Sequence, residues 1–149
     1  MTAIETSETS LTIRRTFDAP RAQVYQAFIT PATIETWQSI GQLAVEVHEL
    51  IPEPGGTLSM SHIPGDEPFI FEGEFLEVIE NERLVHTLRV IDGPFTDDTE
   101  SRISVEFRDV NGGTKVVFSE EQVEPGMLED TVSTWARMLD ELAEVLSES

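Results

Sequence analysis

The fold is decided by one stretch of the sequence, LTIRRTFDAPRAQVYQAFITPATIETW, which runs from Leu11 to Trp37. Apolar and polar residues alternate up to Phe17, which predicts a strand. Asp18 is the predicted N-cap of a following helix, and Pro20 fits its first turn, where the missing N–H costs nothing. An apolar stripe of helical spacing follows, and Thr30 is predicted to end this helix and to cap a second, short one. A strand therefore leads directly into helices.

Downstream of this stretch the apolar period changes to two, which is the period of a half-buried strand. Alternation predicts six further strands, at residues 43–51, 57–63, 69–79, 84–90, 103–107 and 114–120. Turn signals separate them, among them Pro54-Gly55-Gly56 and Asn111-Gly112-Gly113, where glycine permits a positive φ. Val78 breaks the alternation of its strand, so we expect a bulge near Leu76-Glu77. An acidic loop is expected at residues 92–100.

One long helix is predicted near the C-terminal end, spanning roughly Glu129 to Leu146. Apolar residues recur there at three- and four-residue spacing, namely Leu128, Val132, Trp135, Leu139, Leu142 and Leu146. Short turns between successive strands favour an antiparallel sheet, and this helix is the long apolar element that can cover one face of it. The predicted fold is α+β, with a curved sheet of six or seven antiparallel strands wrapped around the C-terminal helix and a cavity between them.

Length and composition limit the class of protein. A chain of 149 residues suits one domain with one core, and we expect residues 11–149 to form it behind a flexible tail of residues 1–10. Cysteine is absent, which excludes thiol catalysis and cysteine-based metal sites. No segment reaches the roughly 18 apolar residues of a membrane span, and no signal peptide is recognisable, so we expect a cytoplasmic protein.

The charge balance narrows the range of partners. The formal net charge is -20, from 29 acidic and 9 basic residues. Nucleic acids and anionic membranes are excluded as partners, because each phosphate contact needs a cation and no basic patch is visible. Lys115 is the only lysine in the sequence. Acidic residues in every element, with lysine nearly absent, favour a halophilic source, because concentrated salt screens the repulsion among them.

Several segments, taken in order, resemble a known superfamily. They are RTFDAP at 15–20, PGG at 54–56, FEGEFLEVIENERLVHT at 71–87 and GGTKVVF at 112–118, together with Trp37 and Trp135. With these segments, residues 11 to 147 resemble the SRPBCC (START/Bet v 1-like) superfamily. Within it, the chain is most similar to the branch named after the activator of Hsp90 ATPase.

The resemblance implies a helix-grip fold, in which a seven-stranded antiparallel sheet surrounds a long helix with a hydrophobic pocket between them. Members of the superfamily bind lipids, hormones or polyketides, and some are cyclases, dehydratases or hydroxylase components. The name of the branch also suggests a co-chaperone. The sequence departs from the family pattern at Trp37-Gln38, where a pair of tryptophans is usual, and at His86, where an aromatic is usual. No relative's ligand is therefore transferred to this chain.

Three polar residues share strand faces with apolar neighbours. His62 lies on the face of Met60, His86 on the face of Leu84, and Glu120 on the face of Phe118. We expect these three side chains to meet at the polar end of a cavity bounded by aromatic side chains. Three alternatives stay open: single structural hydrogen bonds for the histidines, recognition of a polar ligand group, or a His/His/Glu metal site.

The predicted ligand pocket gathers these polar residues with large apolar ones. Its members are Trp37, Met60, His62, Phe71, Phe75, His86, Phe107, Phe118, Glu120, Trp135 and Met138, with Phe69 and Met127 as further candidates. They favour a binding protein for a small apolar or amphipathic molecule that carries a polar group, with no cofactor and no metal. One alternative is a cyclase- or dehydratase-like enzyme that uses a pocket His or Glu as general acid or base, and another is a co-chaperone-like interaction module. A homodimer is left open.

Overall fold

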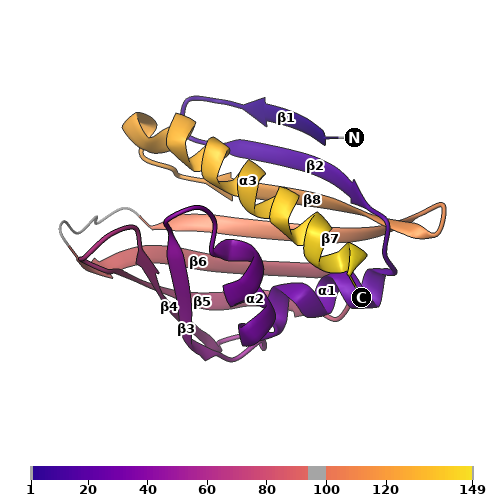
Figure 1. Ribbon diagram of the computed structural model, residues 1–149, viewed down its shortest axis with the longest axis horizontal. Helices are drawn as coiled ribbons and strands as arrows, with labels where there is room; N and C mark the ends of the chain where they lie inside the picture. Colours follow the sequence, from indigo (N-terminus) through magenta and orange to yellow (C-terminus); the bar gives the residue numbers. More distant parts are fainter. Residues whose placement is uncertain (1, 94–99, 149) are drawn as a thin grey trace.

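A computed structural model of the protein describes residues 2–93 and 100–148, which form one curved sheet, a 3₁₀ turn and three α-helices (Figure 1). The strands are β1 (Thr2–Thr6), β2 (Leu11–Phe17), β3 (Ala44–Leu50), β4 (Thr57–Ile63), β5 (Phe69–Ile79), β6 (Arg83–Asp92), β7 (Ser101–Val110) and β8 (Gly113–Glu121). The helices are α1 (Arg21–Ile29), α2 (Pro31–Gln38) and α3 (Leu128–Ser147), with the 3₁₀ turn η1 (Pro125–Met127) just before α3.

The sheet is antiparallel throughout, in the order β1-β2-β8-β7-β6-β5-β4-β3. The predicted α+β helix-grip fold is confirmed, and every predicted strand is present. The described residues form eight strands rather than six or seven, because residues 2–6, expected as a flexible tail, pair with β2 and form the edge strand β1. All five residues of β1 are exposed, so backbone pairing and an ion pair between Glu5 and Arg14 hold the strand rather than burial.

Helices α1 and α2 lie against one end of the sheet. The predicted cap is wrong at Asp18, because α1 has Pro20 as its N-cap and the Pro20 carbonyl accepts the backbone N–H of Val24 at 3.1 Å. Thr30 is the N-cap of α2 as predicted, although its hydroxyl makes no capping hydrogen bond. Helix α2 is fixed by the Trp37 indole, which is fully buried and donates to the Ala27 carbonyl at 2.9 Å.

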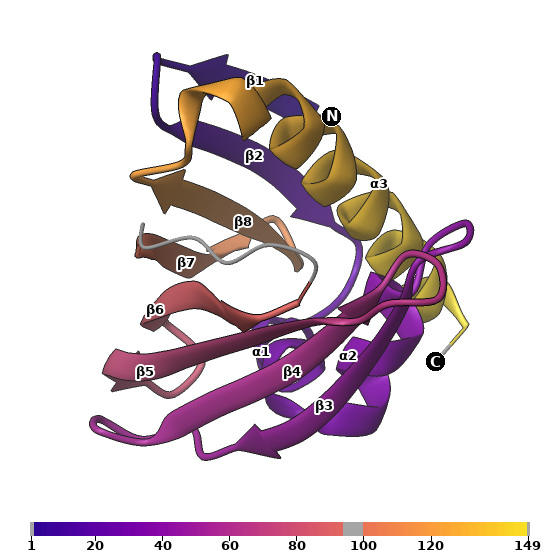
Figure 2. The same cartoon turned by 90° about the vertical axis from the view of Figure 1, so that its left-hand side faces the viewer.

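Helix α3 lies across one face of the sheet, from the side of β1 and β2 toward α1 and α2 (Figures 1 and 2). It matches the predicted span to within one residue at each end. Its buried side chains are Met138, Leu139, Leu142 and Leu146, which pack into the core between helix and sheet. An ion pair between Arg15 of β2 and Asp140 of α3 also joins the helix to the sheet.

The sheet has three register shifts in its described residues, and the sequence predicts one of them. The register of β5 against β6 shifts between Phe75 and Glu77, which confirms the predicted bulge. Asn111 and Gly112 adopt φ values of 47° and 87°, as the predicted hairpin requires. Most of the predicted acidic loop, residues 94–99, lies outside the described residues. No helix in the described ranges has the length and apolarity that crossing a lipid bilayer requires.

Candidate functional site

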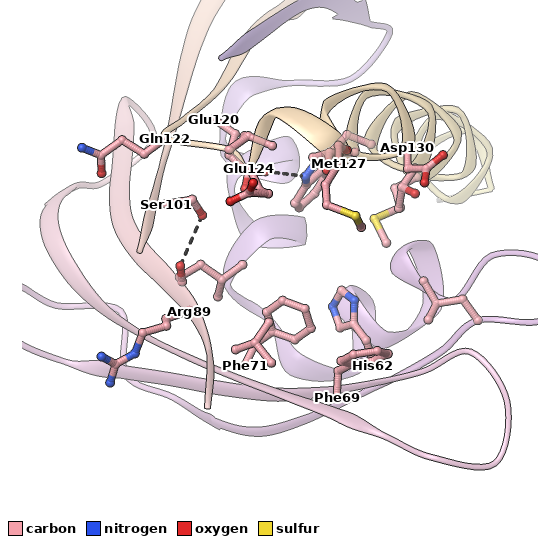
Figure 3. Close-up of a pocket in the computed structure, with 18 of the residues that line it drawn as sticks. His62, Phe69, Phe71, Arg89, Ser101, Glu120, Gln122, Glu124, Met127 and Asp130 are labelled. Atoms are coloured by element: carbon pink, nitrogen blue, oxygen red, sulfur yellow. Dashed lines mark hydrogen bonds between the residues drawn. The ribbon is translucent and has the colours of Figure 1, made fainter. Parts of the chain in front are cut away.

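A cavity of about 320 Å³ lies between the sheet and the N-terminal half of α3. Its walls are mostly apolar and come from strands β4 to β8 of the sheet and from η1 and α3 (Figure 3). The apolar lining includes Phe69, Phe71, Leu88, Val90, Met127, Trp135 and Met138. This volume lies at the lower end of the range for small-molecule sites, so the cavity suits a compact ligand.

Glu120 provides the first polar group of the cavity. It lies near the end of β8, its side chain is buried, and its Oε1 accepts the Trp135 indole N–H at 2.9 Å. Burial raises the pKa of Glu120, while hydrogen bonds from Ser101 and Trp135 lower it in part. The single hydroxyl proton of Ser101 is also offered to the Leu88 carbonyl, at 3.3 Å. Glu120 is therefore an incompletely compensated carboxyl in an apolar wall.

His62 provides the second polar group, from the opposite side of the cavity (Figure 3). Its ring lies 4.5 Å from the Phe71 ring, measured between centroids. Burial lowers the pKa of His62 to about 4, so the imidazole is neutral at neutral pH. Its Nε2 atom is buried and has no hydrogen-bond partner in the described part of the chain. Leaving such an atom unpaired costs about 1–3 kcal/mol, so the position calls for a ligand group or a water.

Charged side chains surround the outer part of the cavity. Glu124 and Asp130 are exposed and line it from the side of η1 and α3. Arg89 of β6 is exposed and lines it from the sheet, and Gln122 adds a neutral polar group. Counting Glu120 inside the cavity, the described part of the lining holds three acidic residues and one basic residue.

A second cavity of about 50 Å³ lies deeper, between α2 and the sheet. His62, Leu88 and Trp135 line both cavities. His86 lines the small one, where its ring meets Phe75 edge-on at 5.5 Å and its Nδ1 donates to the Thr87 carbonyl at 2.8 Å. Burial lowers the pKa of His86, and the Thr87 hydrogen bond opposes that shift. This arrangement matches the structural alternative for a histidine.

The structure divides the predicted pocket residues between these two spaces. The larger cavity has His62, Phe71, Glu120, Trp135 and Met138. The smaller one has His62 and Trp135 again, with Trp37, Met60, Phe75, His86 and Phe118. Phe107 lines neither cavity, because its ring packs under α1 against Tyr25 at 5.4 Å and Phe28 at 5.3 Å. His62 and Glu120 therefore share a cavity, while His86 stands apart from Glu120.

Sequence reasoning missed the outer polar residues of the larger cavity. Thr131 and Thr134 of α3 line it together with Met127 and Met138. The spacing of these four residues is a second helical stripe beside the apolar one, and it is the signal that could have found them. The three predicted polar residues are not gathered as a metal site: residues 2–93 and 100–148 contain no group of three or more His, Cys, Asp or Glu arranged to hold a metal ion.

A curved antiparallel sheet around a long C-terminal helix, with a cavity between them, defines a helix-grip protein. Residues 18–147 match the sequence model of a protein family that is described as "Activator of Hsp90 ATPase homolog 1-like protein". The chain therefore belongs to this family. The predicted superfamily resemblance is thereby confirmed. No curated protein is significantly similar to the chain.

Solved structures of similar fold come from several bacteria. A protein from Chromobacterium violaceum has a TM-score of 0.85 and 22% sequence identity, over 93% of this chain and 97% of that one. A Mycobacterium smegmatis protein has a TM-score of 0.86 and 18% identity, over 98% and 97% of the two chains. A Rhodobacter sphaeroides protein has a TM-score of 0.84 and 19% identity, over 99% of both chains. At these identities the likeness shows the fold alone.

Proposed function

We propose that the protein binds a small, largely apolar molecule with one polar group in the cavity between the sheet and α3. The observation that carries this proposal is the buried and unpaired Nε2 atom of His62, a residue that lines an otherwise mostly apolar cavity. A ligand whose polar group reaches Nε2 would remove the cost of leaving that atom unpaired. The apolar walls would supply affinity, and the polar contacts would fix the orientation of the ligand.

The size of the cavity limits how much apolar surface a ligand can bury there, and therefore how tightly its apolar part can bind. Burial of apolar surface gains about 0.8 kcal/mol per methylene group, so a chain of roughly eight carbons gains about 6 kcal/mol. Association costs at least about 4 kcal/mol of translational and rotational freedom, so the apolar part alone binds weakly. Useful affinity therefore depends on the polar contacts at His62 and Glu120.

Blocking the cavity tests this proposal. Thr134 lines the cavity, whereas the neighbouring Ser133 is exposed and does not line it. We expect Thr134→Phe to abolish binding of small apolar molecules in calorimetry, whereas Ser133→Phe, which adds the same side chain outside, preserves it. Native mass spectrometry of protein purified from its source would then search for a co-purifying molecule that is absent from Thr134→Phe. Equal binding by both variants would place the ligand elsewhere and refute the proposal.

Acid–base catalysis on the bound molecule is the second candidate function. Burial raises the pKa of Glu120 and lowers that of His62, so the cavity has a carboxyl that tends to keep its proton and an imidazole that tends to lose its own. Such a pair can donate a proton on one side of a substrate and accept one on the other. Turnover that is lost in Glu120→Gln while binding persists would favour this candidate. The co-chaperone alternative, the cytoplasmic location and the homodimer stay predictions.

A further inference from the structure

We propose that the preferred ligand is an organic cation, a primary ammonium on an apolar body, whose N–H groups donate to the Glu120 carboxylate, while Nε2 of His62 across the cavity offers a further acceptor to the ligand. This inference rests on the proposed function, because it names the chemical class of molecule that the same cavity would take. It follows from three features of the cavity: the charge of its lining, the missing counter-charge at Glu120, and the acceptor at His62.

The charged side chains that line the cavity are mostly acidic. Among the described residues, Glu124 and Asp130 lie toward the outside and Glu120 lies inside, against the one lining cation Arg89, which is exposed. An ammonium ion is attracted by this lining, whereas a carboxylate or phosphate is repelled. The net charge of -20 on the chain acts in the same direction.

Glu120 lacks a counter-charge in the part of the chain that the structure describes. Its hydrogen bonds from Trp135 and Ser101 come from neutral groups. No ion pair of the described residues includes Glu120. A buried carboxylate without a cation is costly to ionise, and a bound ammonium would supply the missing charge. A neutral alcohol would donate one hydrogen bond but leave the charge of Glu120 uncompensated.

His62 is suited to accept a hydrogen bond rather than to neutralise an anion. Its imidazole is neutral, and Nε2 has a free lone pair in the tautomer that carries its proton on Nδ1. A donor group of the ligand that reaches Nε2 would select that tautomer. Phe71 and Trp135 place aromatic rings in the same cavity, where they add cation–π attraction.

Matched ligands separate this inference from the proposed function. Octylamine, octanol and octanoate share one apolar chain and differ in the head group, which is cationic, neutral and anionic near pH 7. We expect calorimetry to show octylamine binding about tenfold tighter than octanol, with octanoate the weakest. If none of the three binds, the proposed function fails. If octanol or octanoate binds as tightly as octylamine, the cavity binds ligands but the preference for a cation is refuted.

Two variants separate the cavity from the surface, where octylamine could associate with any acidic protein. Glu120→Gln removes the buried carboxylate, and Glu121→Gln removes an equal charge from the next residue, which is exposed and outside the cavity. We expect Glu120→Gln to weaken octylamine about tenfold and to leave octanol nearly unchanged, while Glu121→Gln leaves both unchanged. Equal losses in the two variants would show surface attraction and overturn the inference. If Glu120→Gln fails to fold, Thr134→Phe takes its place: surface attraction would leave octylamine binding unchanged in Thr134→Phe and overturn the inference, whereas binding in the cavity would be lost.

Discussion

His62 makes the stability of the protein depend on pH in a way that replacing this single residue should remove. In the unfolded chain the imidazole has its ordinary pKa of about 6.5, whereas burial lowers the pKa to about 4 in the folded protein. Between these two values the unfolded state binds a proton that the folded state does not. The free energy of unfolding is therefore undiminished above about pH 6.5 and falls as the pH drops toward 4.

The size of this effect follows from the two pKa values. Because the unfolded state binds the extra proton, His62 alone lowers the free energy of unfolding by about 2 kcal/mol between pH 7.5 and pH 5. The choice of pH 5 keeps the protein above its pI of 4.2. At pH 5 the expected change also depends little on the pKa of His62 in the folded protein. If that pKa were one unit higher, the free energy of unfolding would still fall by more than about 1.5 kcal/mol.

Urea unfolding of three proteins at the two pH values would measure this contribution of His62. The proteins are the unmodified chain, His62→Phe and His62→Gln. The contributions of the other titrating groups cancel when the free energies of unfolding of the three proteins are compared. When the pH falls from 7.5 to 5, we expect the free energy of unfolding of both variants to decrease by about 2 kcal/mol less than that of the unmodified protein. Parallel pH dependence of all three proteins, to within about 0.5 kcal/mol, would refute a buried and neutral His62.

Three further changes have defined outcomes. Gly73→Ala would place a Cβ atom 1.9 Å from the Thr87 carbonyl oxygen on β6, so we expect a loss of about 2 kcal/mol or more in urea unfolding. The control Gly65→Ala, with nothing within 4 Å, should be nearly neutral. Trp135→Phe removes a donor that lowers the pKa of Glu120, so the carboxyl resonance of Glu120 should titrate at higher pH, and an unchanged titration would contradict the role of this hydrogen bond. The melting temperature should rise as KCl increases from about 0.1 M toward 1 M, because salt screens the net charge of -20, and a flat profile would count against a halophilic source.

The elements of the fold could be predicted because each long one carries its own apolar periodicity. Alternation identified the strands from β2 to β8, and a break in parity located the bulge at Phe75 and Glu77. Edge strand β1 gave no such signal, because its five residues are all exposed and Ile4 is its only large apolar residue. Pairing of an exposed edge depends on backbone hydrogen bonds, which the sequence pattern does not reveal.

The candidate site could be predicted only in part, because strand parity indicates a face but not a position along it. Parity placed His62, His86 and Glu120 on apolar faces, and all three line a cavity. It did not reveal that the space beneath the helices has two parts, with His86 beside Phe75 in the smaller one. The depth at which each side chain meets α2 or α3 depends on the curvature of the whole sheet, which no local pattern encodes.

Methionine methyl groups offer the most direct measurement of the central claim, that a small molecule binds between the sheet and α3. Met127 and Met138 line the larger cavity, Met60 lines the smaller one, and the fourth methionine is Met1. In a ¹³C-methyl NMR titration with octylamine, we expect saturable shifts of Met127 and Met138 that are much larger than that of Met60. The shifts should vanish in Thr134→Phe and persist in Ser133→Phe. Binding measured by calorimetry without shifts at Met127 and Met138 would show that the molecule binds outside this cavity.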